Sequence, residues 1–173
     1  MFQSSSMIRK AIVALAVFGA VLPSQAAAQS SKSSQLKAAI VFNILRFVDF
    51  PGSNEGALTF CVSSRDPDAS RFRAFSGRTA GSRQVSVRLL SSDSYAGCDV
   101  VYLGDANASE IASASRRGTL VMGDGSRFIN RGGAVGLVRT GSQVRFELNL
   151  KATNQSDIEM SSRLIRLASR ITR

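Results

Sequence analysis

Few residues in this sequence could carry out covalent chemistry, and two short matches suggest nucleophilic catalysis. Ser34 and Lys37 have the SxxK spacing, and Arg139-Thr140-Gly141 resembles the KTG element of serine acyl-transferases that act on penicillin. On a helix, SxxK places the serine and the lysine on one face. A serine-rich stretch produces SxxK by chance, however, and no SDN-like element lies between the two matches. A serine acyl-transferase is therefore the least favoured function.

The sequence lacks the residue type and the glycine-rich motifs most often used in catalysis, metal binding and phosphate binding. It has no histidine, which is the commonest metal ligand and general base, and neither GxGxxG nor GxxxxGK[ST] occurs. Asp66 and Asp68 lack the further spaced ligands of a calcium loop, and Asp124 between two glycines is typical of a turn. We therefore expect no enzymatic activity, no cofactor and no metal.

The N-terminal residues predict export. A short basic region precedes an apolar run over 11–22, and Ala26-Ala27-Ala28 offers the small residues that signal peptidase needs. The run is too short to cross a hydrocarbon core of about 30 Å, because a helix rises about 1.5 Å per residue. We expect a signal peptide over 1–28, cleaved to leave a periplasmic protein with a flexible, serine-rich lead over 29–34.

Cys61 and Cys98 are the only cysteines. An even count in an oxidising compartment favours a disulfide bond. Such a bond would close a loop of about 38 residues and stabilise the fold by about 4 kcal/mol in the chain-entropy model. Two buried thiols or a metal-binding pair are the alternatives, but neither a CxxC spacing nor a histidine supports a metal.

The formal net charge of +10 comes from basic residues scattered over every segment. Nucleic-acid-binding proteins usually concentrate such charge and interleave it with exposed aromatic residues. We therefore expect a solvated basic surface and no nucleic-acid partner. The charge would still favour contact with anionic lipid headgroups or an acidic partner surface.

Apolar periodicity predicts one α/β layered domain over 35–173, with a mixed, mostly parallel central sheet flanked by helices. The opening helix, Gln35–Val48, has one predicted face of Leu36, Ala39, Ile40, Asn43, Ile44 and Phe47. The sequence predicts strands over 57–63, 84–90, 99–103 and 119–122, and helices over 69–75 and 109–117. A β-hairpin over 134–139 and 143–150 and a closing helix over 154–170 complete the domain.

Polar residues in the opening helix and in the hairpin have two interpretations each. Asn43 lies in the apolar stripe of the opening helix, as a core amide or as a ligand. Glu147 and Asn149 alternate with Phe146 and Leu148, so they share the opposite face of their strand. They form either the solvated face of an edge strand or polar partners in a binding groove.

The order of these elements resembles the YfiR-type family of small periplasmic proteins. The resemblance spans Leu36–Ile171 and rests on LKAAIVFNILRFVDFP, LTFCVSS, CDVVYLGD, RGGAVGLVRTGSQVRFELNL and IEMSSRLIRLASRI. It implies a sensor-repressor and not an enzyme. Such a repressor binds the periplasmic sensing domain of a membrane-bound diguanylate cyclase and lowers cyclic-di-GMP. The resemblance also implies a homodimer, and an outer-membrane lipoprotein that relieves inhibition by sequestering the repressor.

The resemblance extends to some of the family's residues and not to others. Cys61 and Cys98 match the cysteines that pair in the family. The family's archetype has a second disulfide in the segment matching Phe128–Val135, where this chain has no cysteine. Asp99 stands where the family usually has a histidine. The redox-responsive element is therefore reduced to one bridge or is missing.

A partner surface is predicted on the hairpin and the start of the last helix. It comprises Arg131, Phe146, Glu147, Asn149 and Ile158, with apolar residues around Ile158 expected to be exposed. A small apolar patch with arginines at its rim is typical of a reversible interface. The alternative function is a periplasmic small-molecule binding module, which an apolar pocket with few convergent polar groups would favour.

Overall fold

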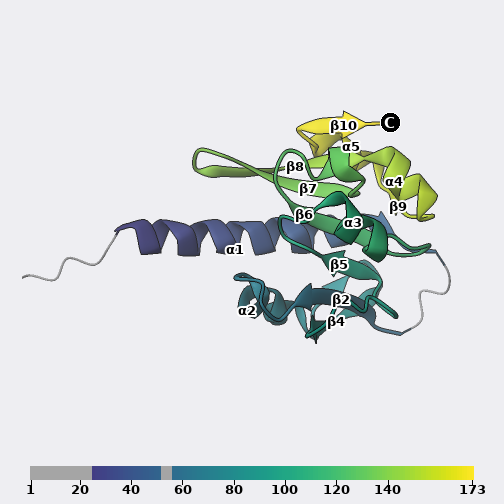
Figure 1. Cartoon of the computed structure of the whole chain (residues 1–173), viewed down its shortest axis with the longest axis horizontal. Helices are drawn as coiled ribbons and strands as arrows, with labels where there is room; N and C mark the ends of the chain where they lie inside the picture. The colour runs from purple at the N-terminus through teal and green to yellow at the C-terminus, as the bar shows by residue number, and fades with distance from the viewer. Residues whose placement is uncertain (1–24, 52–55) are drawn as a thin grey trace, which may run out of the picture.

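An eight-stranded sheet forms the middle layer of the computed structural model (Figure 1), which describes residues 25–51 and 56–173. The strand order is β10-β8-β7-β6-β5-β2-β4-β3, and only β7–β8 and β3–β4 pair antiparallel. This mixed, mostly parallel sheet confirms the predicted fold class. Its strands are β2 (Leu58–Ser63), β3 (Thr79–Ala80), β4 (Arg83–Leu90), β5 (Val100–Tyr102), β6 (Leu120–Asp124), β7 (Val135–Thr140), β8 (Gln143–Asn149) and β10 (Arg170–Thr172).

One long helix and several short ones cover the two faces of this sheet. They are α1 (Gln25–Leu45), α2 (Ala69–Phe72), η1 (Arg73–Phe75), α3 (Ala108–Ala114), η2 (Ile129–Arg131), α4 (Leu150–Gln155) and α5 (Ser162–Leu167). A separate two-stranded ladder joins β1 (Val48–Asp49) to β9 (Glu159–Met160). No helix in the described ranges has both the length and the apolar character needed to cross a membrane.

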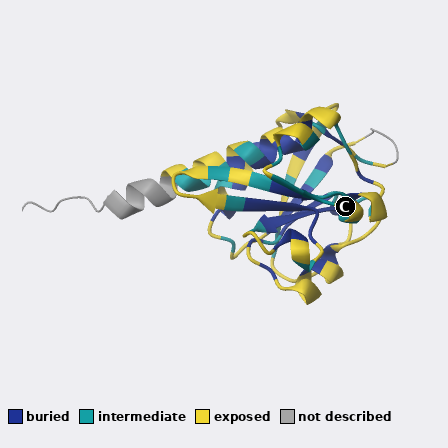
Figure 2. Ribbon diagram, turned by 90° about the horizontal axis from the view of Figure 1, so that it is seen from above, coloured by how far each residue is buried: buried dark blue, intermediate teal, exposed yellow. Residues whose placement is uncertain are grey.

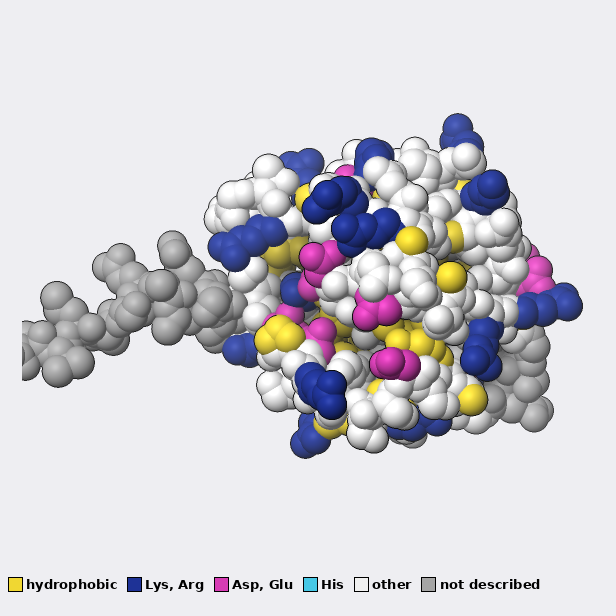
Figure 3. All heavy atoms as spheres, in the orientation of Figure 1, with side chains coloured by type: hydrophobic (Ala, Val, Ile, Leu, Met, Phe, Trp, Pro, Cys, Tyr) yellow, Lys and Arg dark blue, Asp and Glu magenta, His cyan; other side chains and the backbone are white. Residues whose placement is uncertain are grey.

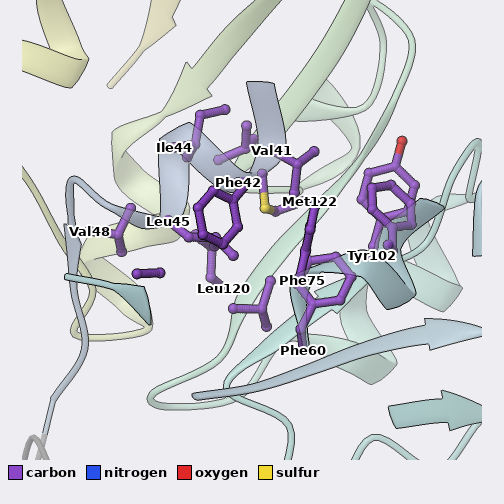
Figure 4. Packing of buried hydrophobic residues seen from close by; sticks show 14 of the residues in the cluster. Val41, Phe42, Ile44, Leu45, Val48, Phe60, Phe75, Tyr102, Leu120 and Met122 are labelled. Carbon is purple, nitrogen blue, oxygen red and sulfur yellow. The ribbon is translucent and has the colours of Figure 1, made fainter. Parts of the chain in front are cut away.

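Two apolar cores lie on opposite faces of the sheet, because side chains alternate along each strand. On β2, Phe60 and Val62 belong to the larger core with α1, α2 and η1, whereas Cys61 belongs to the smaller core with α3. Figure 2 shows the buried positions concentrated on the strands. In the larger core, Phe60 and Phe75 approach edge to face with 5.4 Å between ring centroids (Figure 4).

The structure corrects the predicted face of the opening helix. The side chains that α1 buries are Ala38, Val41, Phe42, Ile44 and Leu45. Of the predicted face only Ile44 is buried; Leu36, Ala39 and Asn43 are exposed, and Ile40 and Phe47 are half-buried. The interpretation of Asn43 as a core amide is therefore wrong. The sequence carries two adjacent apolar stripes, and periodicity alone does not say which one faces the sheet.

The helix also begins earlier than predicted. α1 starts at Gln25 and includes 29–34, for which the sequence predicts a flexible lead. No proline or glycine interrupts this segment, so nothing in it forces the helix to end. Residues 1–24, which hold most of the predicted signal peptide, lie outside the described residues.

The predicted hairpin is confirmed, but the closing helix over 154–170 is not continuous. The chain forms α4, β9, α5 and β10 in turn, and β10 pairs parallel to β8. Asp157 adopts a left-handed conformation with φ of 53°, which ends α4. The Ser161 side chain then accepts a hydrogen bond from the Leu164 amide at 3.2 Å and starts α5 as a new helix.

The predicted disulfide is present. Cys61 on β2 bonds to Cys98, which immediately precedes Asp99 and β5, and both side chains are buried. The Arg88 guanidinium donates to the Ala96 carbonyl at 2.5 Å and lies 2.8 Å from the Cys98 sulfur. The bond therefore fixes the connection between β4 and β5 against the smaller core.

Reduction of this disulfide is expected to lower the free energy of unfolding. The bond joins two residues that are 37 positions apart in the sequence. Without the bond the unfolded chain gains conformational entropy, which should lower the free energy of unfolding by about 4 kcal/mol in the chain-entropy model. Urea unfolding, followed by circular dichroism with and without dithiothreitol, measures this difference.

The matched control is the Cys61→Ala/Cys98→Ala double variant, which should unfold at the same urea concentration with and without dithiothreitol. An unchanged midpoint for the reduced natural chain would contradict the prediction.

Candidate functional site

Lys37 connects α1 to the carboxyl ends of two strands. Its ammonium lies 2.6 Å from Asp68 Oδ2, in the loop after β2, and 2.8 Å from Asp124 Oδ2, at the end of β6. The Tyr102 hydroxyl donates to Asp124 Oδ1 at 2.7 Å, and Asp66 Oδ1 accepts from the Asp68 amide at 2.8 Å. These five residues form the Lys37 cluster, which joins four separate elements of the chain.

Opposing effects set the ionisation of this cluster. Burial lowers the pKa of Lys37, but the carboxylates of Asp124 and Asp68 more than offset it, so its pKa is raised. Burial opposes ionisation of Asp68, but hydrogen bonds from Lys37 and Ser34 hold its pKa below the usual value. Burial and the Asp68 and Asp124 carboxylates raise the pKa of Asp66. The cluster therefore favours the protonated form of Lys37 and the ionised form of Asp68.

The residues of the two matches to serine acyl-transferases lie around one hollow, but they are not arranged to activate a nucleophile. Ser34, Lys37 and Arg139 line one hollow of about 520 Å³. A lysine that activates a serine must be able to accept a proton, and Lys37 is held protonated by two carboxylates. The Ser34 hydroxyl is hydrogen-bonded to Asp68, which the same lysine neutralises. This arrangement positions α1 and does not generate a nucleophile.

An apolar groove lies between α1, β8 and α5. Its volume is about 400 Å³, and Ile40, Asn43, Ile44, Phe47, Val144, Arg145, Phe146, Leu164, Leu167, Ala168 and Ser169 line it. Leu167 is 65% exposed at its edge, and Leu36, one turn before Ile40 on α1, is 41% exposed. These two are the exposed large hydrophobic residues of the described ranges. An exposed apolar patch with this shape is typical of a binding surface.

The charges beside this groove are basic. Arg145 lines it, and the Arg163 guanidinium lies 5.8 Å from the centre of the Phe47 ring. Arg166 lies on α5 between Leu164 and Leu167. No carboxylate belongs to the residues that line the groove. The groove therefore combines an apolar floor with a positive rim.

Sequence comparison identifies the family. The profile described as DUF4154, YfiR/HmsC-like, matches residues 34–169. This chain belongs to the YfiR/HmsC-like family. Membership confirms the sequence resemblance and is consistent with a periplasmic regulator of a diguanylate cyclase, because the family is regulatory rather than catalytic. No curated protein matches the chain.

Two solved structures share the fold of this YfiR/HmsC-like chain. One is an ABC domain from Streptococcus pneumonia in complex with L-Trp, with 9% identity and a TM-score of 0.52. The other is a conserved domain protein from Vibrio cholerae, with 16% identity and a TM-score of 0.51. Each comparison covers 80% of this chain but 60% of the other chain. The likeness is one of fold.

Three of the predicted partner-surface residues, Ile158, Glu147 and Asn149, are buried or hydrogen-bonded within the fold. Ile158 is 2% exposed, so the expectation that it lies on the surface is wrong. Glu147 is 8% exposed and accepts from Arg170 at 2.7 Å. The Asn149 amide donates to the Ile129 carbonyl at 3.0 Å, and its oxygen starts α4 by accepting from the Ala152 amide. The edge-strand interpretation of β8 also fails, because β10 pairs with its outer side.

The other two predicted partner-surface residues, Phe146 and Arg131, lie in different parts of the structure. Phe146 is half-buried and lines the apolar groove. Arg131 bonds Asp105 at 3.0 Å and the Ala106 carbonyl at 2.8 Å, away from that groove. The glycines after Arg131 also have a packing role. A Cβ on Gly133 would lie 2.1 Å from the Phe128 ring, so only glycine fits there.

The Lys37 cluster predicts stability changes of opposite sign at two aspartates. The ionised form of Asp68 is favoured by folding, so Asp68→Asn should lower the free energy of unfolding at pH 7. The ionised form of Asp66 is disfavoured, so Asp66→Asn should raise it at pH 7. Urea unfolding of the three proteins between pH 3 and pH 7 measures both differences.

The pH dependence gives each variant its own control. The Asp68 contribution is present above the usual value of 3.8 and is lost as pH falls through the lowered pKa. The unfavourable Asp66 contribution disappears as pH falls through its raised pKa, so it vanishes first. Two variants that shift stability in the same direction at pH 7 would refute this account.

Proposed function

We propose that this chain is a periplasmic repressor that binds the sensing domain of a membrane-bound diguanylate cyclase and thereby lowers cyclic-di-GMP. Membership of the YfiR/HmsC-like family over residues 34–169 supports the regulatory role. The observation that carries a binding role is the apolar groove with exposed Leu167 at its edge. A regulator that acts by contact needs such a surface and needs no catalytic group.

The groove is the proposed docking site for the cyclase domain. An apolar floor favours insertion of one or two large side chains, because burying them removes apolar surface from water. The positive rim of Arg145, Arg163 and Arg166 favours acidic residues beside those anchors. The partner segment is therefore an amphipathic one, with apolar anchors on one side and carboxylates at its edges.

This placement revises the partner surface expected from the sequence. Phe146 stays in the proposed surface, and Leu36 and Leu167 join it. Ile158, Glu147 and Asn149 support β8 and α4 from within the fold. Sequestration by an outer-membrane lipoprotein and a homodimer also belong to this proposal, as the means by which repression is relieved and the form in which the repressor acts.

Deleting the gene should raise cellular cyclic-di-GMP, and restoring it should reverse the rise. The reason is that a repressor that binds the cyclase holds its output down. Mass-spectrometric measurement of cyclic-di-GMP in the two strains provides the test. Unchanged cyclic-di-GMP in every growth condition tested would exclude a diguanylate cyclase as the target.

A charge placed in the groove should abolish tight binding without unfolding the protein. Leu167→Asp should weaken binding to the purified cyclase sensing domain at least tenfold, since truncating or charging an interface anchor typically costs more than 1 kcal/mol. Leu167 is 65% exposed, so the substitution should leave the fold of the protein intact. Biolayer interferometry measures the affinity, and a thermal melt checks folding.

Ala112→Asp is the matched control, because Ala112 is an exposed position on α3, outside the groove. This variant should bind the cyclase domain with unchanged affinity and restore repression in the deletion strain. Full binding by Leu167→Asp would place the interface elsewhere.

A further inference from the structure

The strand order reverses direction at β2, and this creates a crevice at one end of the sheet. From β2 the chain moves to β4 on one side, then returns past β2 to β5 and continues to β6 on the other side. The loops that leave β2 and β5 therefore lie over opposite faces of the sheet. In open α/β sheets, ligands bind in the crevice outside the carboxyl ends of the strands at such a reversal.

The same end of the sheet is acidic in a basic protein. Half of the 12 acidic residues in the sequence lie in or shortly after the ends of β2, β4, β5 and β6: Asp66, Asp68, Asp93, Asp105, Glu110 and Asp124. Figure 3 shows acidic side chains gathered in the middle of the face it presents, with most Lys and Arg side chains around them. Lys37 forms ion pairs with two of these carboxylates, and Arg131 pairs with a third.

A hollow of about 330 Å³ lies at this reversal point. Ser63 and Arg65 form one wall after β2, and the loop from Ser91 to Tyr95 forms another after β4. Leu103, Ala106 and Glu110 follow β5 and complete it. We call it the switch-point crevice. It shares no lining residue with the apolar groove.

Charges of both signs line the switch-point crevice and are available to a ligand. Within the described ranges, Arg65 and Asp93 form no ion pair. Glu110 accepts from the Asn107 amide at 2.8 Å, and no ion pair involves it within the described ranges. Burial and the carboxylates of Asp93 and Glu110 raise the pKa of the Tyr95 phenol, which therefore stays protonated between them. Leu90 and Leu103 supply apolar surface beside these groups.

We propose that the switch-point crevice binds a free amino acid or a zwitterion of similar size. Arg65 would hold the carboxylate, because a guanidinium donates charge-assisted hydrogen bonds to it. Asp93 and Glu110 would hold the ammonium group. Leu90 and Leu103 would contact an apolar side chain. A cavity of this volume accommodates one such molecule and its first waters.

The disulfide supports one wall of the crevice. The loop after β4 contains Ser91, Asp93 and Tyr95 and ends at Cys98, which is bonded to Cys61 on β2. Holding the loop that carries Asp93 in place before the ligand arrives reduces the entropy that binding would otherwise cost. Affinity should therefore be lower for the Cys61→Ala/Cys98→Ala protein than for the disulfide-bonded one.

Thermal shift of the oxidised, full-length mature protein tests the proposal, with each protein-forming L-amino acid as a separate probe at millimolar concentration. A ligand that binds the native state raises the melting temperature. At least one amino acid should do so, and calorimetry should confirm it. The deaminated and the decarboxylated analogue of that amino acid should each bind at least tenfold more weakly, because each lacks one charge.

Variants locate the site. Arg65→Gln and Asp93→Asn should each weaken binding at least tenfold, whereas Arg116→Gln, an exposed arginine outside the crevice, should leave it unchanged. The proposal is overturned if no amino acid stabilises the protein, or if the Arg65→Gln/Asp93→Asn double variant binds as the natural chain does. Cyclase binding by these variants should stay normal, so failure here is distinct from failure of the repressor function.

Discussion

The ion pairs of Lys37 fix how α1 lies on the sheet, and the apolar groove depends on that placement. Lys37 continues the buried stripe of Val41 and Ile44 toward the start of the helix. Its contacts with Asp68 and Asp124 hold that stripe toward the sheet. The second apolar stripe, with Leu36 and Ile40, is then left facing the hairpin and solvent. The groove is the consequence of a helix with two apolar stripes of which the domain covers one.

The two faces of the sheet are stabilised in different ways. The larger core has a long helix and interlocking aromatic rings, so burial of apolar area is the main contribution there. The smaller core has one short helix, α3, and the disulfide between Cys61 and Cys98 lies within it. A covalent link is most useful where few apolar side chains are available to hold a long connection in place. The crevice wall after β4 lies on this less extensively packed side.

Patterns local in sequence predicted the strands, the hairpin and the disulfide, because they depend on alternation, turn residues and a count of cysteines. The stripe on α1 was misassigned, since apolar residues form two adjacent stripes on that helix and periodicity does not say which one faces the sheet. The prediction of one closing helix in the last third of the chain was wrong. The apolar residues from Ile158 to Ile171 have helical spacing, but the left-handed backbone of Asp157 ends one helix and the Ser161 side chain caps the start of another. The Lys37 cluster joins residues 31 and 87 positions apart, and no local pattern marks such pairs.

The switch-point crevice and the apolar groove are separate in residues but joined by a short path. Arg65 precedes Asp66, which accepts from the Asp68 amide, and Asp68 bonds Lys37 on the helix that forms one wall of the groove. Such a path transmits a change only if one of its elements has two arrangements of similar energy. Two charge-assisted hydrogen bonds of 2.6 and 2.8 Å hold Lys37, and they favour a single arrangement. The physical expectation is therefore independent occupation of the two surfaces, with coupling arising only where a ligand or a partner displaces Asp68 from Lys37.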